Sequence, residues 1–207
     1  MRARSPNAIA DRLSVAVFPS SLGWMAVAGS ARGLRQLTFG HASPAAALAG
    51  LPRAGTKAGI LPDVADNGVV TWNPQLVARL QAYAKGTRDD FGDVLLDDRE
   101  LGPFQRRVVA GCRKIPYGET LTYGGLAALA GSPRAARAVG TTMSTNCTPL
   151  VVPCHRVVAA SGLGNYSAGE GVRMKLRLLE MEHGAPLPAA SSLKTKKRPT
   201  SRPGSPV

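Results

Sequence analysis

The middle of the chain, residues 103–143, carries start and stop signals for three short helices. A proline opens this range, in a position that suits the first turn of a helix, and apolar residues follow it at helical spacing. Thr122 is a typical N-cap, Gly131 is a typical helix stop, and Ser132 with Pro133 at the first helical position predicts another helix. Two short helices joined by a glycine-containing turn predict a helix-turn-helix.

The part of the chain before these helices predicts a small antiparallel sheet with one helix. Three segments have the apolar patterns of strands and are separated by glycine-containing turns. They are residues 13–17, 24–27 and 34–39. Residues 42–66 are rich in Ala, Gly and Pro and predict a loop with one helical turn, and residues 74–85 predict a helix that Gly86 ends.

These elements together predict a chain of the α/β (α+β) class with two domains and a tail. Residues 1–98 would form an α/β domain, and residues 99–184 a mostly helical domain that ends in a helix from about Val172 to His183. Residues 185–207 contain five basic residues, no acidic residue and many Pro, Ser and Ala. We expect this tail to be disordered, because it has too few apolar residues to build a core.

The charge of the chain predicts a polyanionic partner. The formal net charge is +13 and the pI is near 10.5, which favours nucleic acid. Residues 101–167 contain seven Lys and Arg against one acid, Glu119. The three cysteines form no CxxC pair and no even set, which predicts a reducing, intracellular compartment. No apolar run approaches the roughly 20 residues of a membrane span, so we expect no membrane partner.

The run Leu150–Val158 places a thiol and an imidazole side by side between two valine pairs that we interpret as strand segments. A lone cysteine in apolar surroundings is usually an inert core residue. Here, however, His155 and Arg156 follow Cys154 directly. A nucleophilic thiolate needs such a base or positive charge to bring its pKa down from about 8.5. The run therefore predicts a cysteine nucleophile.

Seven features of the sequence, in this order and spacing, resemble the O6-alkylguanine-DNA alkyltransferase (methylated-DNA–protein-cysteine methyltransferase) family. They are Gly102-Pro-Phe-Gln-Arg-Arg-Val, Ile115-Pro-Tyr-Gly-Glu-Thr, Thr122-Tyr-Gly-Gly-Leu-Ala, Pro133-Arg-Ala-Ala-Arg-Ala-Val-Gly, Asn146, Pro153-Cys-His-Arg-Val and Gly164-Asn-Tyr-Ser. The resemblance covers roughly residues 12–184 and is strongest in the second half. It implies a ribonuclease-H-like amino-terminal domain, followed by a helix-turn-helix ("winged helix-like") domain that carries the active-site cysteine.

The resemblance also implies a reaction. Cys154 would take the alkyl (methyl) group from O6 of guanine, and from O4 of thymine, in one irreversible turnover, after the nucleotide has been flipped out of the duplex. The partner would be double-stranded DNA that contains O6-alkylguanine. No cofactor and no metal are expected, because the first domain lacks the cysteines that form a zinc site in some relatives. We expect a monomer that acts at the DNA, in the cytoplasm or nucleoid, or in a nucleus.

By the same resemblance, Cys154, a water, His155 and Glu182 would form a proton relay, with Glu180 as a lesser candidate for the carboxylate. The water would be needed because the side chains of adjacent extended residues point to opposite faces. Tyr123 would donate to N3 of the departing base, and Asn146 would support the turn around the nucleophile.

Two further sets of residues are assigned by the resemblance. The substrate pocket would be lined by Tyr166, Ser167 (through its backbone N–H, which would hold O6), Pro149, Val157 and Gly164. DNA would be bound by Arg134, Ala135, Ala136, Arg137, Gly140, Thr141 and Ser144. Among these, Arg137 would fill the place of the flipped nucleotide, and its small-sided helix would enter the minor groove. Thr141 and Ser144 stand where some relatives have glycine and arginine.

Two other classes of protein compete with this interpretation. A non-catalytic helix-turn-helix regulator or alkyl-lesion sensor would share the fold, but such sensors carry another residue at the position of Cys154. A Cys-His hydrolase is a weaker alternative, because neither His41 nor His183 comes with an evident orienting partner.

Overall fold

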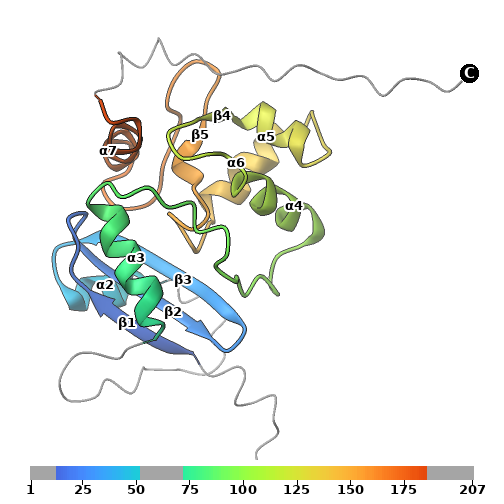
Figure 1. Ribbon diagram of the computed structural model, residues 1–207. Helices are drawn as coiled ribbons and strands as arrows, with labels where there is room; N and C mark the ends of the chain where they lie inside the picture. Colours follow the sequence, from blue (N-terminus) through green and yellow to red (C-terminus); the bar gives the residue numbers. More distant parts are fainter. Residues whose placement is uncertain (1–12, 52–71, 186–207) are drawn as a thin grey trace, which may run out of the picture.

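The computed structural model of the 207-residue chain describes residues 13–51 and 72–185. Its amino-terminal part is a three-stranded antiparallel sheet in the order β1-β2-β3. The strands are β1 (Ser14–Phe18), β2 (Trp24–Ser30) and β3 (Gly33–His41), and the helices beside them are α2 (Pro44–Gly50) and α3 (Pro74–Ala84). Figure 1 shows α3 lying across one face of this sheet, with α2 beside the strands.

Residue alternation along the strands explains this layering. Met25 and Val27 of β2 belong to the same buried cluster as Leu80 of α3. Ala26 and Ala28 point to the other face and are small enough to let α2 approach β2 closely. The three strands and α3 agree with the elements expected from the sequence.

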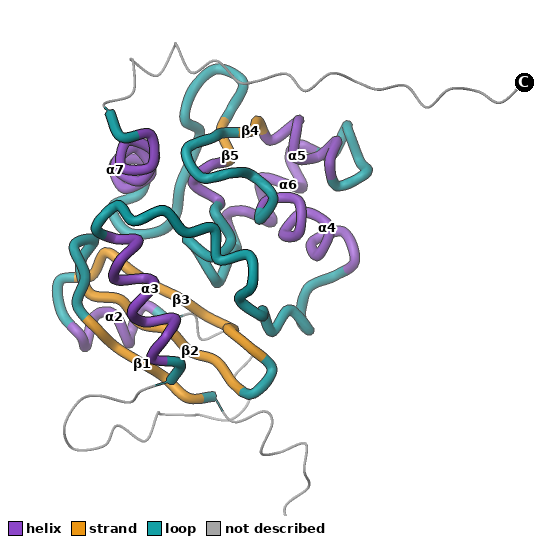
Figure 2. Tube along the Cα trace, viewed as in Figure 1, coloured by secondary structure: helices purple, strands orange, loops and turns teal. Residues whose placement is uncertain are grey.

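The second part of the chain is mostly helical. It contains α4 (Pro103–Cys112), α5 (Tyr123–Leu129), α6 (Ala136–Ser144), the short 3-10 helix η1 (Cys154–Arg156) and α7 (Val172–His183), as Figure 2 shows. The two-residue strands β4 (Leu121–Thr122) and β5 (Val157–Val158) pair in parallel. This pairing brings the start of α5 beside the end of η1, and so brings Tyr123 near Cys154.

Two buried clusters form the core. One lies among α4, α5 and α6, around residues such as Val108, Leu126 and Val139. The other joins the sheet and α3 to Leu150 and Leu178 of the second part. Because α7 completes the core of the amino-terminal part, the two parts share buried surface, and the boundary between residues 98 and 99 stays a prediction.

Two expected elements differ in the structure. The helix predicted from Pro133 begins only at Ala136, because Ser132 to Ala135 form a β-turn in which Ala135 N–H donates to Ser132 O at 2.9 Å and proline takes its favoured second position. Arg134 therefore precedes α6.

The segment around the candidate nucleophile is also not extended. Residues 154–156 turn as η1, with Arg156 N–H donating to Pro153 O at 2.9 Å. Val151 and Val152 form no named strand, whereas Val157 and Val158 do. The expectation that Cys154 and His155 lie on opposite faces of a strand is therefore wrong.

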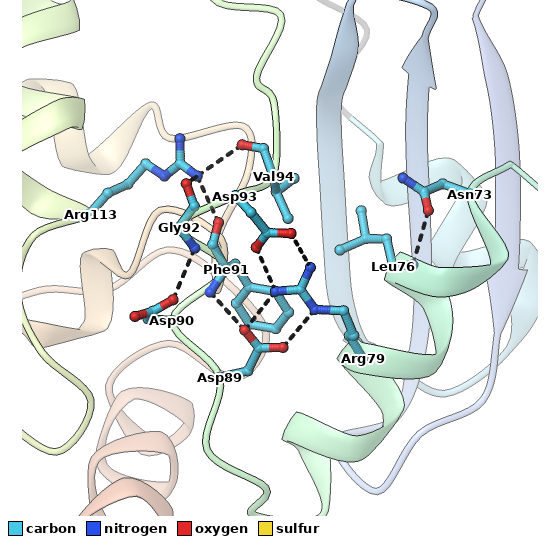
Figure 3. A network of polar contacts seen from close by, with 10 residues as sticks. All are labelled: Asn73, Leu76, Arg79, Asp89, Asp90, Phe91, Gly92, Asp93, Val94 and Arg113. Carbon is cyan, nitrogen blue, oxygen red and sulfur yellow. Dashed lines mark hydrogen bonds and ion pairs between the residues drawn. The ribbon is translucent and has the colours of Figure 1, made fainter.

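The loop between α3 and α4 is held from both sides by arginines. Figure 3 shows Arg79 of α3 paired with both Asp89 and Asp93, and Arg113 donating to three backbone carbonyls of residues 91–94. The Arg79 guanidinium holds the pKa of Asp89 below its usual value. Phe91, fully buried between them at φ 52°, is fixed by these contacts.

Residues 52–71, which include the rest of the predicted loop, and residues 186–207, which include nearly all of the predicted tail, lie outside the described residues. Across residues 13–51 and 72–185, no helix is both long and apolar enough to cross a membrane.

Candidate active site

A pocket of about 640 Å³ brings together residues from α5, α6, η1 and the loop after β5. Its lining includes ten of the residues expected at the site. They are Cys154, Tyr123, Tyr166, Ser167, Gly164, Ala136, Arg137, Gly140, Thr141 and Ser144. The nucleophile candidate and the arginine expected to act on DNA therefore face one cavity. Those two residues are seventeen positions apart in the sequence, and Val139 and Met143 of α6 lie in the same buried cluster as Cys154.

Cys154 is nearly buried, with 7% of its surface exposed. Asn146 Nδ2 donates to its sulfur at 3.1 Å and to Val152 O at 2.9 Å, which fixes the turn before η1. Burial raises the pKa of the Cys154 thiol, although Asn146, the Tyr166 hydroxyl and the charge of Lys175 each act to lower it. The Tyr166 hydroxyl itself has no hydrogen bond of normal geometry among the described residues. The resting sulfur is thus a thiol, and a base must remove its proton.

His155 is fully buried behind the nucleophile and is paired with Glu182 of α7, with Nε2 at 2.9 Å from Oε1. Burial lowers the pKa of His155, and the nearby carboxylate offsets only part of this effect. The imidazole is therefore neutral near pH 7. Within the described residues its Nδ1 has no hydrogen-bond partner, so this nitrogen is available to accept a proton.

The environment of Glu182 determines which nitrogen of His155 carries hydrogen. Arg156 donates to both carboxylate oxygens, at 2.8 to 3.2 Å, and Gly118 N–H donates to Oε2 at 3.2 Å. Although burial alone would raise the pKa of Glu182, hydrogen bonds from His155 and Arg156 lower it far below its usual range. An ionised carboxylate only accepts hydrogen bonds. His155 must therefore donate from Nε2, which leaves the lone pair on Nδ1. The structure places Glu182, and not Glu180, in this pair.

Lys175 is a polar residue of the site that the sequence interpretation did not single out. Its side chain is fully buried, and Nζ donates to Val157 O at 2.6 Å and lies about 6 Å from the ring centres of Tyr123 and Tyr166. Burial lowers the pKa of Lys175 to about 8. Its position on α7, seven residues before Glu182 and so on the same helix face, was a signal that could have revealed it.

The remaining predicted residues occupy different places. The Tyr123 hydroxyl lies 3.5 Å from Asn165 O, and burial raises its pKa, so it is a protonated donor. Gly164 has φ +70°, and a Cβ there would lie 3.2 Å from the Tyr123 ring. Pro149 and Val157 are buried and do not line the pocket, and the Val157 carbonyl accepts from Lys175. The expectation that they line it is corrected.

Arg134 and Ala135 also lie outside the pocket lining, in the turn that precedes α6. In the described part of the chain no group of three or more His, Cys, Asp or Glu side chains could hold a metal ion. The site is thus a thiol in a pocket, backed by a neutral imidazole and an ionised carboxylate. This arrangement defines a protein with a cysteine nucleophile.

Comparisons with known proteins identify the family. Residues 103–184 match the family model described as "6-O-methylguanine DNA methyltransferase, DNA binding domain". Methylated-DNA–protein-cysteine methyltransferases from Mycolicibacterium paratuberculosis and Metallosphaera sedula are 45% and 42% identical to the chain. These alignments cover 55% and 52% of this chain, and 70% and 65% of the two relatives.

Solved structures extend the similarity over both parts of the chain. A crystal structure of Mycobacterium tuberculosis OGT in complex with DNA matches with a TM-score of 0.63 and 35% identity, over 84% of this chain and 95% of that one. The O6-methylguanine-DNA methyltransferase of Pyrococcus kodakaraensis matches with a TM-score of 0.57 and 25% identity, over 82% and 98%. The chain therefore belongs to the methylated-DNA–protein-cysteine methyltransferase family.

Proposed function

We propose that this protein repairs alkylated DNA directly, by moving the alkyl group from O6 of guanine to its own Cys154. The observation that carries this proposal is that Cys154 faces the same pocket as Arg137, with His155 and Glu182 packed behind it. A non-catalytic regulator or lesion sensor is not favoured, because it would need neither the thiol nor the buried pair. A cysteine hydrolase is not favoured, because the chain belongs to the methylated-DNA–protein-cysteine methyltransferase family.

The proton path begins at the Cys154 thiol. Its proton would pass through a water to Nδ1 of His155, the nitrogen left without a partner. The imidazolium so formed would be stabilised by Glu182, which stays ionised and does not take up the proton. Because burial holds the resting sulfur as a thiol, we infer that the thiolate forms only as the substrate reacts.

The transfer itself exchanges one bond for another. The sulfur forms a bond to the alkyl carbon while the bond from that carbon to O6 breaks, and the electron pair passes to the guanine. Tyr123, a protonated donor at the pocket wall, would supply a proton or hydrogen bond to N3. The Ser167 N–H would hold O6. The product is a thioether on Cys154, which water does not readily cleave, so each molecule acts once.

The pocket also fits a mode of DNA binding. Arg137, Thr141 and Ser144 are exposed on α6, and Ala136 and Gly140, each next to one of them, are small. We propose that this helix enters the minor groove and that Arg137 occupies the place of the flipped nucleotide. In the same proposal, the sheet with α3 is the ribonuclease-H-like domain of the family, and the α5–α6 pair belongs to a winged-helix-like domain. The protein acts as a monomer inside the cell. Transfer from O4 of thymine would use the same thiol.

The direct test is a mass measurement. The full-length protein is incubated with a duplex that contains one O6-methylguanine, and its peptides are then analysed. We expect one methyl group on the peptide that contains Cys154 and unmodified guanine in the DNA. A repaired duplex with an unmodified Cys154, or an unrepaired duplex bound to the protein, would overturn the proposal.

Arg137→Ala tests the role of α6 in flipping. Because flipping a base out of the stack costs a few kcal/mol, we expect repair of a duplex to slow by about tenfold to a hundredfold. Reaction with the free modified base, which needs no flipping, should change little. Single-turnover rates on both substrates measure this difference. Arg173→Ala is the matched control, because Arg173 is exposed on α7 away from the pocket. Equal losses on duplex and free base would count against the flipping role.

A further inference from the structure

A side chain from the amino-terminal part of the protein reaches the buried pair behind the nucleophile. Tyr83 lies in the last turn of α3 and is fully buried. Its hydroxyl donates to Oε1 of Glu182, the same oxygen that accepts from His155, and it lies 3.4 Å from Nε2 of His155. Tyr83 is 72 residues from His155 and 99 from Glu182 in the sequence, and it lies outside the range that matches the family model.

The direction of this hydrogen bond follows from the chemistry of its partners. Glu182 is ionised and accepts only, and Nε2 of His155 already carries the hydrogen that it donates to Glu182. Burial and the charge of Glu182 raise the pKa of Tyr83 well above its usual value. Tyr83 is therefore a permanent donor to the carboxylate.

The Tyr83 hydroxyl completes the set of donors around Glu182. The other donors are His155 Nε2, Arg156 Nε and Nη2, and Gly118 N–H. Three of these donors, Tyr83 Oη, His155 Nε2 and Arg156 Nη2, meet at Oε1, whereas Gly118 N–H donates to Oε2. Without Tyr83, Oε1 would keep more negative charge beside His155 Nε2, and Glu182 would lose the contact that fixes it from the side of α3.

The ring of Tyr83 also has well-defined contacts. It packs against Phe91 with ring centres 5.5 Å apart and edge-on against Tyr117 at 6.1 Å. Phe91 in turn lies under the guanidinium of Arg79, which is paired with Asp89 (Figure 3). The position of the hydroxyl is thus set by the amino-terminal core and by the loop that follows α3.

We propose that Tyr83 is a positioning residue for alkyl transfer, which fixes Glu182 so that His155 presents Nδ1 to the nucleophile. Through it, the amino-terminal part of the protein sets the reactivity of a thiol in the carboxy-terminal part. This inference rests on the proposed function for its activity readout, but the titration of His155 in the protein without DNA tests it independently.

The groups that face His155 determine the sign of the expected effect. Glu182 and Lys175 face it from α7, Arg156 from η1 and Tyr83 from α3. Removing the Tyr83 hydroxyl leaves more negative charge on Oε1 beside Nε2, which favours the protonated imidazole. The pKa of His155 should therefore rise in Tyr83→Phe. Because neutral His155 is the base, the acid limb of the pH–rate profile should move to higher pH.

Tyr83→Phe removes one oxygen and keeps the ring contacts. Tyr117→Phe is the matched control, because Tyr117 packs in the same cluster while its hydroxyl donates to Gly86 O at 3.2 Å and not to Glu182. For each protein, ¹⁵N NMR follows the three histidines through pH, with the His155→Gln variant to assign the signals. Single-turnover methyl transfer from an O6-methylguanine duplex is measured from pH 5 to 8, a range chosen to bracket the usual histidine pKa of about 6.5.

In Tyr83→Phe we expect the pKa of His155 and the acid limb to rise together by roughly 0.5 to 1 pH unit, the size expected for the loss of one hydrogen bond to a carboxylate. The plateau rate should fall about tenfold, while Tyr117→Phe matches the wild type. An unshifted His155 titration in Tyr83→Phe, whatever its rate, would overturn the inference, as would an equal shift in Tyr117→Phe. A wild-type protein that transfers no methyl group would overturn the proposed function and leave the titration result standing.

Discussion

Replacing Cys154 with alanine is expected to abolish methyl transfer completely while binding to alkylated DNA persists. In the proposed reaction the sulfur bonds to the alkyl carbon, and no other side chain in the pocket lining is a comparable nucleophile. The residues of α6 that we propose to bind DNA form no hydrogen bond to the sulfur among the described residues, so removing it should leave that surface intact. Transfer is followed by the mass of the protein after incubation with an O6-methylguanine duplex, and binding by a mobility shift.

The two other cysteines provide the controls for this experiment. Cys147 is half-buried and Cys112 fully buried, and burial raises the pKa of both thiols. Neither lines the pocket that contains Cys154. Cys147→Ala should therefore transfer the methyl group at the rate of the wild type. If Cys154→Ala still gained a methyl group, or if Cys147→Ala lost it, the nucleophile would have to be reassigned.

Local signals in the sequence were sufficient for most of the fold. Proline, Thr122 and Gly131 mark helix ends because their effects depend on neighbours a few residues away, and α4, α5 and α7 form where these signals predict. α6 starts later than predicted because Ser132-Pro133 suits a β-turn as well as a helix start. The Cys154 segment differs from the predicted strand because a valine-rich run has strand propensity, whereas Pro153 and the Asn146 hydrogen bonds favour the turn of η1.

The parts of the site that the sequence did not reveal depend on contacts between distant segments. The sequence places Tyr83 on the apolar face of α3, where it looks like an ordinary core residue. Only the packing of α7 against the sheet places its hydroxyl beside Glu182. The sequence predicts that the charge of Arg156 can help to activate the thiol, but its guanidinium is paired with Glu182 instead. The pKa of the Cys154 thiol likewise could not be predicted, because burial raises it and hydrogen bonds from Asn146 and Tyr166 lower it, and both depend on the packing of the whole pocket.

Glu182→Gln should both destabilise the protein and slow the reaction strongly. Arg156 is 1% exposed, and its guanidinium has Glu182 as its ion-pair partner. Removing one member of a buried pair leaves an uncompensated charge and costs about 3 to 5 kcal/mol. A glutamine would also turn an N–H donor toward groups that are donors themselves. His155 would lose the carboxylate that stabilises its protonated form, so transfer should slow by about a hundredfold or more.

Glu180→Gln makes the same change of charge two residues earlier on the same helix, outside the hydrogen bonds to His155 and Arg156, and serves as the matched control. Urea denaturation gives the stability and single-turnover transfer gives the rate. The pKa of Glu182 is depressed, so its stabilising effect is fully present above the unfolded-state value near 4.5 and is lost only as the pH falls through the much lower folded-state value. The stability gap between wild type and Glu182→Gln should therefore persist from pH 7 to pH 4.5. If Glu180→Gln lost activity and Glu182→Gln kept it, the carboxylate of the relay would be Glu180, and the buried pair with Arg156 would be structural alone.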